Sequence, residues 1–312
     1  MLLTSLTEAP LGLSRDEIGQ LFAAFVQRRA ERGDVEWDTK LRARQRSVLR
    51  RALRRFALGW LPQHQRRAVA VTGEYAEVWD RIAYADYDPN NTPPRYSLWQ
   101  WGGESLLASN IGATRFRQLI LIKLIESLRP RRVLEVGRGN GINLLLLAGR
   151  FPDIAFTGVE LTAAGQSAAR RLQQLATLPE HLAAFAPRPM LDPTAFRRID
   201  FQQGDATALD FPAGNFDLVY TVLALEQMER VRERALAEIA RVTDRHFFAL
   251  EPFREFNRDF WERLYGFGRD YFQGRIDDLP RHGLTPVLAF NDFPQERFLR
   301  TCAVLAEKSG LS

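Results

Sequence analysis

Residues 133–141 read Val-Leu-Glu-Val-Gly-Arg-Gly-Asn-Gly. The pattern predicts an apolar strand that ends in an acid, a glycine-rich turn and the start of a helix. Glycines let the backbone approach a ligand closely, and the amides at a helix start offer polar contacts. The dinucleotide-binding pattern G-x-G-x-x-G is absent, because Ile142 or Leu144 occupies its last position. We therefore expect a ligand-binding turn of another kind.

Short apolar strands alternate with helices around this turn. We expect helices at about 113–128, 141–150, 162–177 and 228–242, and strands at 132–136, 155–160, 199–203, 216–222 and 246–250. Such alternation is typical of βαβ units and a parallel sheet. Two further strands, near 284–290 and 297–307, are placed to close the sheet as a hairpin. The predicted fold class is α/β: a Rossmann-like, mostly parallel sheet with a C-terminal antiparallel hairpin.

Two more acids follow predicted strands at the same edge of this sheet. Glu160 ends the second strand, where a carboxylate can accept hydrogen bonds from both hydroxyls of a ribose. Asp205 follows the third strand in Gly-Asp-Ala, where it could accept from an adenine amino group. The fourth strand, 216–222, ends at the topological switch point, where ligands bind in open α/β sheets.

In this order the motifs resemble the class I S-adenosylmethionine-dependent methyltransferases, and most closely their small-molecule group. The resemblance covers roughly residues 113–255. It implies S-adenosyl-L-methionine as cofactor and no metal ligands. Gly137, Gly139 and Gly141 would pass under its methionine part, and Glu135 would lie near its amino group. Glu160 would hold the ribose, and the remaining contacts would come from Leu161, Asp205, Ala206 and Thr221.

The resemblance does not identify a general base. Many relatives carry a histidine pair after the fourth strand, whereas this chain has Leu-Glu-Gln-Met at 225–228. Glu226 is the first candidate base, and Glu251, at the end of the fifth strand, is the second, because a carboxylate in a dry pocket can have its pKa raised towards neutrality. The alternatives are a helix-start carboxylate for Glu226 and a salt bridge to Arg254 for Glu251. Orientation of the acceptor can make a base optional.

The part before the sheet domain is expected to be a helical cap or lid, with the boundary between residues 112 and 113. Ser14 and Glu17 predict a helix start, and a second apolar stripe runs from Leu41 to Trp60. Arginines at every fourth position share one helix face, which is either solvated or a docking surface for an anionic partner: Arg42, Arg46, Arg50 and Arg54. The turn-rich segment 86–95 is the candidate linker.

Three aromatic residues lie just before the sheet domain: Tyr96, Trp99 and Trp101. Either they form a lid over the cofactor, facing its sulfonium, or they join the N-terminal helices to the sheet domain. The first reading makes them substrate-site residues.

Composition limits the setting of the protein. One cysteine, Cys302, excludes an internal disulfide framework and favours a reducing cytoplasm. No apolar run is long enough to span a bilayer, and the net charge of +5 favours an anionic partner only weakly. The leading hypothesis is O-, N- or C-methylation of a small molecule. An RNA or protein methyltransferase that docks its substrate on the arginine face, a non-catalytic scaffold and a homodimer remain open.

Overall fold

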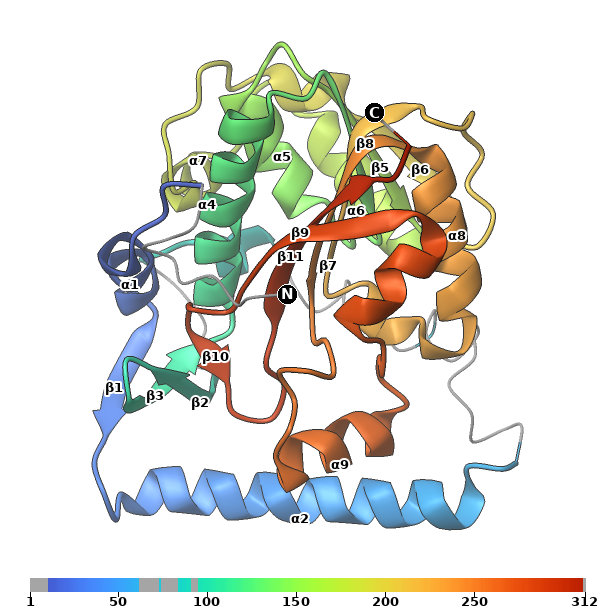
Figure 1. Cartoon of the computed structure of the whole chain (residues 1–312). Helices are drawn as coiled ribbons and strands as arrows, with labels where there is room; N and C mark the ends of the chain where they lie inside the picture. Colours follow the sequence, from blue (N-terminus) through green and yellow to red (C-terminus); the bar gives the residue numbers. More distant parts are fainter. Residues whose placement is uncertain (1–10, 62–72, 74–83, 91–94, 311–312) are drawn as a thin grey trace.

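The main sheet has seven strands and the expected topology (Figure 1). The computed structural model describes residues 11–61, 73, 84–90 and 95–310. The strands lie in the order β6 (Asp200–Gln203), β5 (Ala155–Glu160), β4 (Arg132–Val136), β7 (Phe216–Val222), β8 (Thr243–Glu251), β11 (Cys302–Lys308) and β9 (Leu284–Phe290). The first five are parallel, and β11 runs antiparallel between β8 and β9. This confirms the predicted α/β fold and its C-terminal hairpin.

Helices cover both faces of this sheet, so that it lies at the centre of three layers (Figure 1). One face packs against α4 (Ile111–Leu128), α5 (Ile142–Arg150) and α6 (Ala163–Gln173), and the other against α8 (Arg232–Val242). The expected loop 179–198 contains the short helix α7 (Glu180–Phe185) and the 3-10 turn η3 (Ala195–Arg198). Three more 3-10 turns are η4 (Leu225–Gln227), η5 (Glu229–Val231) and η6 (Ile276–His282). No helix in the described ranges is long and apolar enough to cross a membrane.

The N-terminal part is not purely helical, which corrects the sequence-based expectation. The expected helices are present as α1 (Arg15–Ala23) and α2 (Val35–Leu58), and Ser14 caps α1 by accepting from the Glu17 amide. Between and after them, however, lies a second, antiparallel sheet. Its strands are β1 (Val26–Ala30), β3 (Glu104–Ser109), β2 (Tyr96–Trp101) and β10 (Gln295–Glu296).

The second sheet connects both ends of the chain. Its strand β10 comes from the C-terminal region and pairs with β2, so residues before 112 and after 290 share backbone hydrogen bonds. The 3-10 turn η2 (Tyr84–Tyr87) packs on α7 through Tyr87 and Phe185. Residues 91–94 of the expected linker lie outside the described residues, and the boundary at 112 stays a prediction.

Helix α2 packs against α9 (Phe260–Arg269) with only part of the predicted stripe, which includes Val48 and Ala52. The buried side chains are Trp37, Val48 and Ala52. Three members of the predicted stripe, Leu49, Phe56 and Trp60, are instead exposed. Two arginines tie the helices together: Arg44 donates to the Tyr265 hydroxyl and Arg55 to the Asp270 carboxylate.

Candidate functional site

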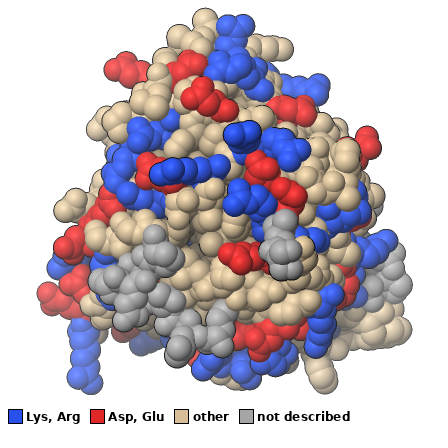
Figure 2. All heavy atoms as spheres, turned by 45° about the horizontal axis from the view of Figure 1, so that its top comes forward, with Lys and Arg blue, Asp and Glu red and all other residues tan. Residues whose placement is uncertain are grey.

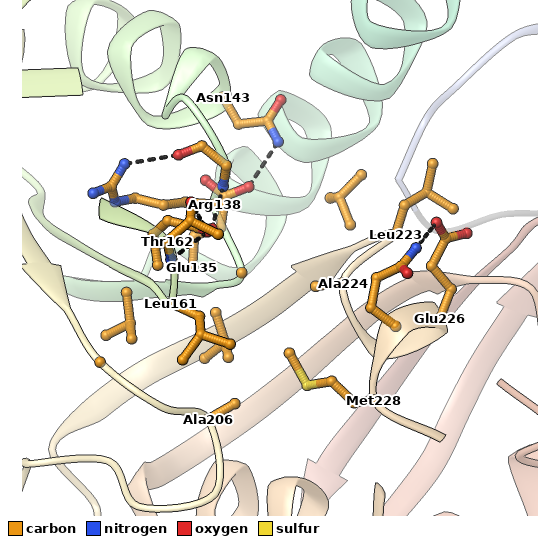
Figure 3. A pocket seen from close by; sticks show the side chains of 18 of the residues that line it. Glu135, Arg138, Asn143, Leu161, Thr162, Ala206, Leu223, Ala224, Glu226 and Met228 are labelled. Carbon is orange, nitrogen blue, oxygen red and sulfur yellow. Dashed lines mark hydrogen bonds between the residues drawn. The ribbon is translucent and has the colours of Figure 1, made fainter. Parts of the chain in front are cut away.

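A cavity of about 620 Å³ opens at the carboxyl ends of the parallel strands. One wall is made by the loops after β4, β5 and β6, and the opposite wall by the loop after β7. Figure 3 shows Glu135, Thr162 and Leu161 on the first wall and Leu223, Ala224 and Glu226 on the second. This is the place where open α/β sheets bind ligands.

The glycine turn forms the edge of the cavity. Gly137, Gly139 and Gly141 all have positive φ, of 74°, 58° and 81°. Gly137 has no room for a side chain, because an added Cβ would lie 2.4 Å from the Cβ of Ala224 on the opposite wall. Gly137 and Gly139 line the cavity, whereas Gly141 caps α5 behind it, against the Phe201 ring.

Glu160 is held in place by hydrogen bonds on both of its carboxylate oxygens. The Gly139 amide donates to Oε2 at 3.0 Å, and the Thr162 amide and hydroxyl donate to Oε1 at 2.9 and 2.6 Å. The side chain is almost fully buried and lines the cavity. Oε2 accepts only one of these bonds and keeps a further lone pair, so Glu160 can accept from a ligand hydroxyl there without losing its donors.

Glu135 lies deepest in this wall and is part of a buried polar network. Asn143 donates to one of its oxygens at 2.7 Å and the Tyr220 hydroxyl to the other at 3.1 Å, and Gln118 donates to Asn143. Burial raises the pKa of Glu135 to about 7, although both hydrogen bonds lower it. A cationic ligand group beside Glu135 would favour its ionised form.

Arg138, the bulky residue between the first two glycines, braces the turn from behind. Its guanidinium donates to the Gly158 and Gly139 carbonyls and to Gln166, and it stacks over the Phe201 ring at 4.4 Å. Burial lowers the pKa of Arg138 to about 10, so it remains charged at neutral pH. Gly158 makes this path possible, because a Cβ there would meet the Arg138 side chain.

The predicted contacts at the rim are also found along the cavity. Leu161, Asp205 and Ala206 all line it. Ala206 is buried, whereas Asp205 is exposed and accepts from the Thr207 amide at 2.8 Å.

The opposite wall depends on Glu251, which does not reach the cavity. Its carboxylate accepts three consecutive backbone amides, those of Ala224, Leu225 and Glu226. Burial raises the pKa of Glu251 to about 7, and the Thr221 hydroxyl beside it lowers the pKa. Thr221 and Glu251 are both fully buried and neither lines the cavity. Glu251 is therefore a positioning residue for the wall, which corrects its expected role as a base.

Glu226 does line the cavity, as does Met228. Its side chain is buried and accepts from Gln227 Nε2, and it faces the space between the walls (Figure 3). The wall bends at Leu223, whose φ of 53° is unusual for a branched residue. Backbone strain of this kind tends to concentrate at functional sites.

The three aromatic residues expected to form a lid do not line the cavity. Tyr96, Trp99 and Trp101 lie on β2 in the second sheet. Trp99 is buried against Phe22, with ring centroids 5.2 Å apart, and Trp101 stacks under the Arg15 guanidinium. The prediction of an aromatic lid is thus wrong, because these rings pack the N-terminal elements against the sheet domain.

Sequence reasoning missed the contribution of α4 and η2 to the cavity. Thr114 and Arg117 reach it from α4, and Tyr87 reaches it from η2. Burial lowers the pKa of Arg117 to about 10, and its Nε has no hydrogen-bond partner among the described residues. Three carboxylates act on Arg117 through electrostatic attraction: Glu226, Glu296 and Glu251. An arginine in a largely buried helix gives no sequence signal for such a role.

Known proteins resemble the chain in its sheet domain. Residues 134–246 match the family model described as a methyltransferase domain. A fatty-acid O-methyltransferase from Mycolicibacterium smegmatis is 34% identical over 112 residues, which are 36% of this chain and 33% of that protein. The chain thus matches about a third of the length of this curated relative.

One solved structure supports the fold. The 4+2 cyclase SpnF is 16% identical, covers 78% of this chain and 97% of its own, and has a TM-score of 0.52. The magnesium protoporphyrin IX methyltransferase of Synechocystis, solved with S-adenosylhomocysteine, is 14% identical over 64% of this chain and 85% of its own, with a TM-score of 0.46. The family match and the glycine turn identify residues 134–246 as a class I S-adenosylmethionine-dependent methyltransferase domain.

Proposed function

We propose that the chain binds S-adenosylmethionine in this cavity and transfers its methyl group to a small-molecule acceptor. The proposal rests chiefly on one arrangement: the glycine turn, Glu135 and Glu160 lie along one wall of a single cavity. Glu160 would hold the ribose, Glu135 the cationic amino group, and Asp205 with Ala206 the adenine. When bound, S-adenosylmethionine supplies a methyl group activated by its sulfonium.

The acceptor that this cavity favours is a carboxylic acid with an apolar body. Arg117 presents a buried guanidinium with an unsatisfied Nε, and a carboxylate is its best-matched partner. Apolar side chains line the same cavity: Val222, Leu223, Met228 and Val231. The likeness to a fatty-acid O-methyltransferase supports the same class of acceptor.

With such an acceptor the protein needs only to orient and desolvate the carboxylate, and no base is required because the carboxylate carries no proton. Arg117 would hold and orient the acceptor carboxylate, and S-adenosylmethionine, held by the wall with the glycine turn, would supply the methyl group to a carboxylate oxygen and keep the electron pair of the broken carbon–sulfur bond. The products are a methyl ester and S-adenosylhomocysteine, so both reactants lose one unit of charge. Charge that disappears in the transition state favours a cavity from which water is excluded.

A second candidate is a hydroxyl or amine acceptor with Glu226 as the base, as the sequence suggested. Glu226 is buried in the same cavity and could accept the proton that such an acceptor releases. The two acceptor classes make opposite demands, because a carboxylate depends on Arg117 and a hydroxyl depends on Glu226.

The experiment compares three variants with a long-chain acid and its matching alcohol as acceptors. Arg117→Gln removes the proposed anchor, Glu226→Gln removes the base, and Arg115→Gln is the control, since Arg115 lies on the same helix but does not line the cavity. Loss of a charge-assisted hydrogen bond of about 1.5–3 kcal/mol predicts a KM for the acid raised about tenfold or more in Arg117→Gln. Turnover of the acid should persist in Glu226→Gln and Arg115→Gln.

Other results would exclude this reading. Methylation of the alcohol alone, abolished in Glu226→Gln, would favour the base mechanism. Absence of S-adenosylmethionine binding in calorimetry would favour the non-catalytic scaffold, a reading kept open because the fold itself also occurs in a protein named a cyclase. Methylation of RNA or protein, dependent on the arginines of α2, would support the third alternative.

A further inference from the structure

Helix α2 presents an uncovered face next to its contact with α9. The helix lies along the bottom of the molecule in Figure 1, with α9 above it. At about 1.5 Å per residue its 24 residues extend roughly 36 Å. Trp37 and Val48 are buried in a cluster with Tyr265 of α9, and the exposed residues lie around the rest of the helix surface.

Large apolar side chains are exposed on this outer face. Leu49, Leu53 and Phe56 are 44%, 60% and 83% exposed. At 100° per residue these three fall within one narrow sector of the helix, and three exposed apolar side chains on one face mark a surface that contacts something else.

The same face carries basic residues without acidic ones. The sequence from Thr39 to Leu58 contains seven arginines, one lysine and no aspartate or glutamate. Within the described residues, ion pairs from this stretch are made by Lys40, Arg44 and Arg55. Four of the exposed arginines make none with any residue that the structure describes: Arg42, Arg46, Arg50 and Arg54. On the face shown in Figure 2, by contrast, acidic and basic side chains are interspersed.

These observations select one kind of partner. A second copy of this chain, docked through the same face about a two-fold axis, would bring arginines against arginines, which repel. A nucleic acid would satisfy the arginines but not the exposed leucines and phenylalanine. A membrane surface with anionic headgroups satisfies both, because arginines pair with phosphates while apolar side chains enter the boundary with the acyl chains.

We propose that the outer face of α2 docks this protein on anionic lipid surfaces, lying in the plane of the interface rather than crossing it. The inference does not depend on the proposed activity, although a membrane-docked enzyme would have direct access to apolar acids. An arginine near an anionic surface strengthens binding roughly fivefold at physiological salt, and the gain declines as salt rises.

Flotation of the full chain with vesicles tests the proposal. Vesicles that contain phosphatidylglycerol should bind the protein, and vesicles of phosphatidylcholine alone should not. Arg46→Gln with Arg50→Gln should weaken binding about 25-fold, the product of two fivefold losses. Leu53→Ser with Phe56→Ser should weaken it about tenfold, while the cavity and its affinity for S-adenosylmethionine stay unchanged.

The control replaces the same residue types elsewhere on the surface. Leu191→Ser with Arg197→Gln lies in the segment after α7, at the top of Figure 1, and both residues are exposed. This variant should bind vesicles like the original chain. The proposal is overturned if both vesicle types bind equally or not at all, if the control loses binding as strongly, or if light scattering shows that the α2 variants disrupt a dimer. It is also overturned if soluble polyanions bind with equal affinity and the apolar substitutions have no effect.

Discussion

Replacing Gly137 by alanine changes the glycine turn in two ways that can be measured separately. The residue has a φ of 74°, where an L side chain is strained by about 1–2 kcal/mol. The new Cβ would also lie 2.4 Å from the Cβ of Ala224, so that one wall of the cavity must move. Overpacking of this kind costs about 1–3 kcal/mol. The expected loss in the free energy of unfolding is therefore about 2–5 kcal/mol, the sum of these two effects.

Gly283→Ala provides the matched control for the strain alone. Gly283 has nearly the same φ, 73°, but nothing lies within 4 Å of an added Cβ. Its replacement should cost about 1–2 kcal/mol and leave the affinity for S-adenosylmethionine unchanged. Gly137→Ala should lose most of that affinity, because the moved wall narrows or distorts the cavity.

Ala224→Gly provides the rescue, because it removes the atom that the new methyl group meets. Urea unfolding of the four members of this double-mutant cycle should give a favourable coupling of about 1–3 kcal/mol, equal to the overpacking cost. If Gly137→Ala is no more destabilising than Gly283→Ala, or if the coupling is near zero, the two walls are not in contact as described.

Two further predictions concern Glu135, which lines the cavity, and Trp99, which does not. Glu135, whose pKa is raised to about 7, is protonated at lower pH and ionised at higher pH. Because a cationic ligand prefers the ionised form, calorimetry should show that the affinity for S-adenosylmethionine falls up to about tenfold for each pH unit below 7. Glu135→Gln should abolish this dependence, and an affinity of the unmodified chain that is constant from pH 5.5 to about 8.5 would exclude it. Trp99→Leu should lower the free energy of unfolding by about 2–4 kcal/mol without changing the affinity for S-adenosylmethionine. An unchanged free energy of unfolding with a reduced affinity would instead support a role of Trp99 as a lid.

The parallel sheet and its binding edge could be predicted because their signals are local. Strands buried on both faces form short apolar runs, and the turn at Gly137 needs a backbone conformation that glycine supplies. The position of Glu160 in the cavity followed directly, because a residue that ends a parallel strand next to the glycine turn must lie at the same edge.

The second sheet and the α2 packing could not be predicted in this way. Strand β1, Val-Gln-Arg-Arg-Ala, carries few apolar residues, and β10 has only two residues, so neither shows a strand pattern. On α2, Leu49 and Phe56 have the hydrophobicity of core residues, yet only Val48 and Ala52 of the same predicted stripe are buried. Which face is buried depends on a partner more than 200 residues away.

Roles that depend on side-chain direction were equally out of reach. Arg117 lies in a helix whose pattern predicts only burial, and its approach to the cavity depends on how α4 is rotated against the sheet. Glu251 ends a strand at the correct edge, as Glu160 does, but its carboxylate turns to backbone amides rather than to the cavity.

The three hydrogen bonds that Glu251 accepts from backbone amides affect how a ligand enters the cavity. They fasten the loop after β7 to the end of β8, so hydrogen bonds within the protein set the shape of this wall of the cavity. Binding of a ligand that fits therefore costs little conformational entropy of the loop, and a ligand that is too thick clashes with a rigid wall. The rigidity of this loop, rather than its attraction to the ligand, therefore sets how thick a ligand the cavity accepts.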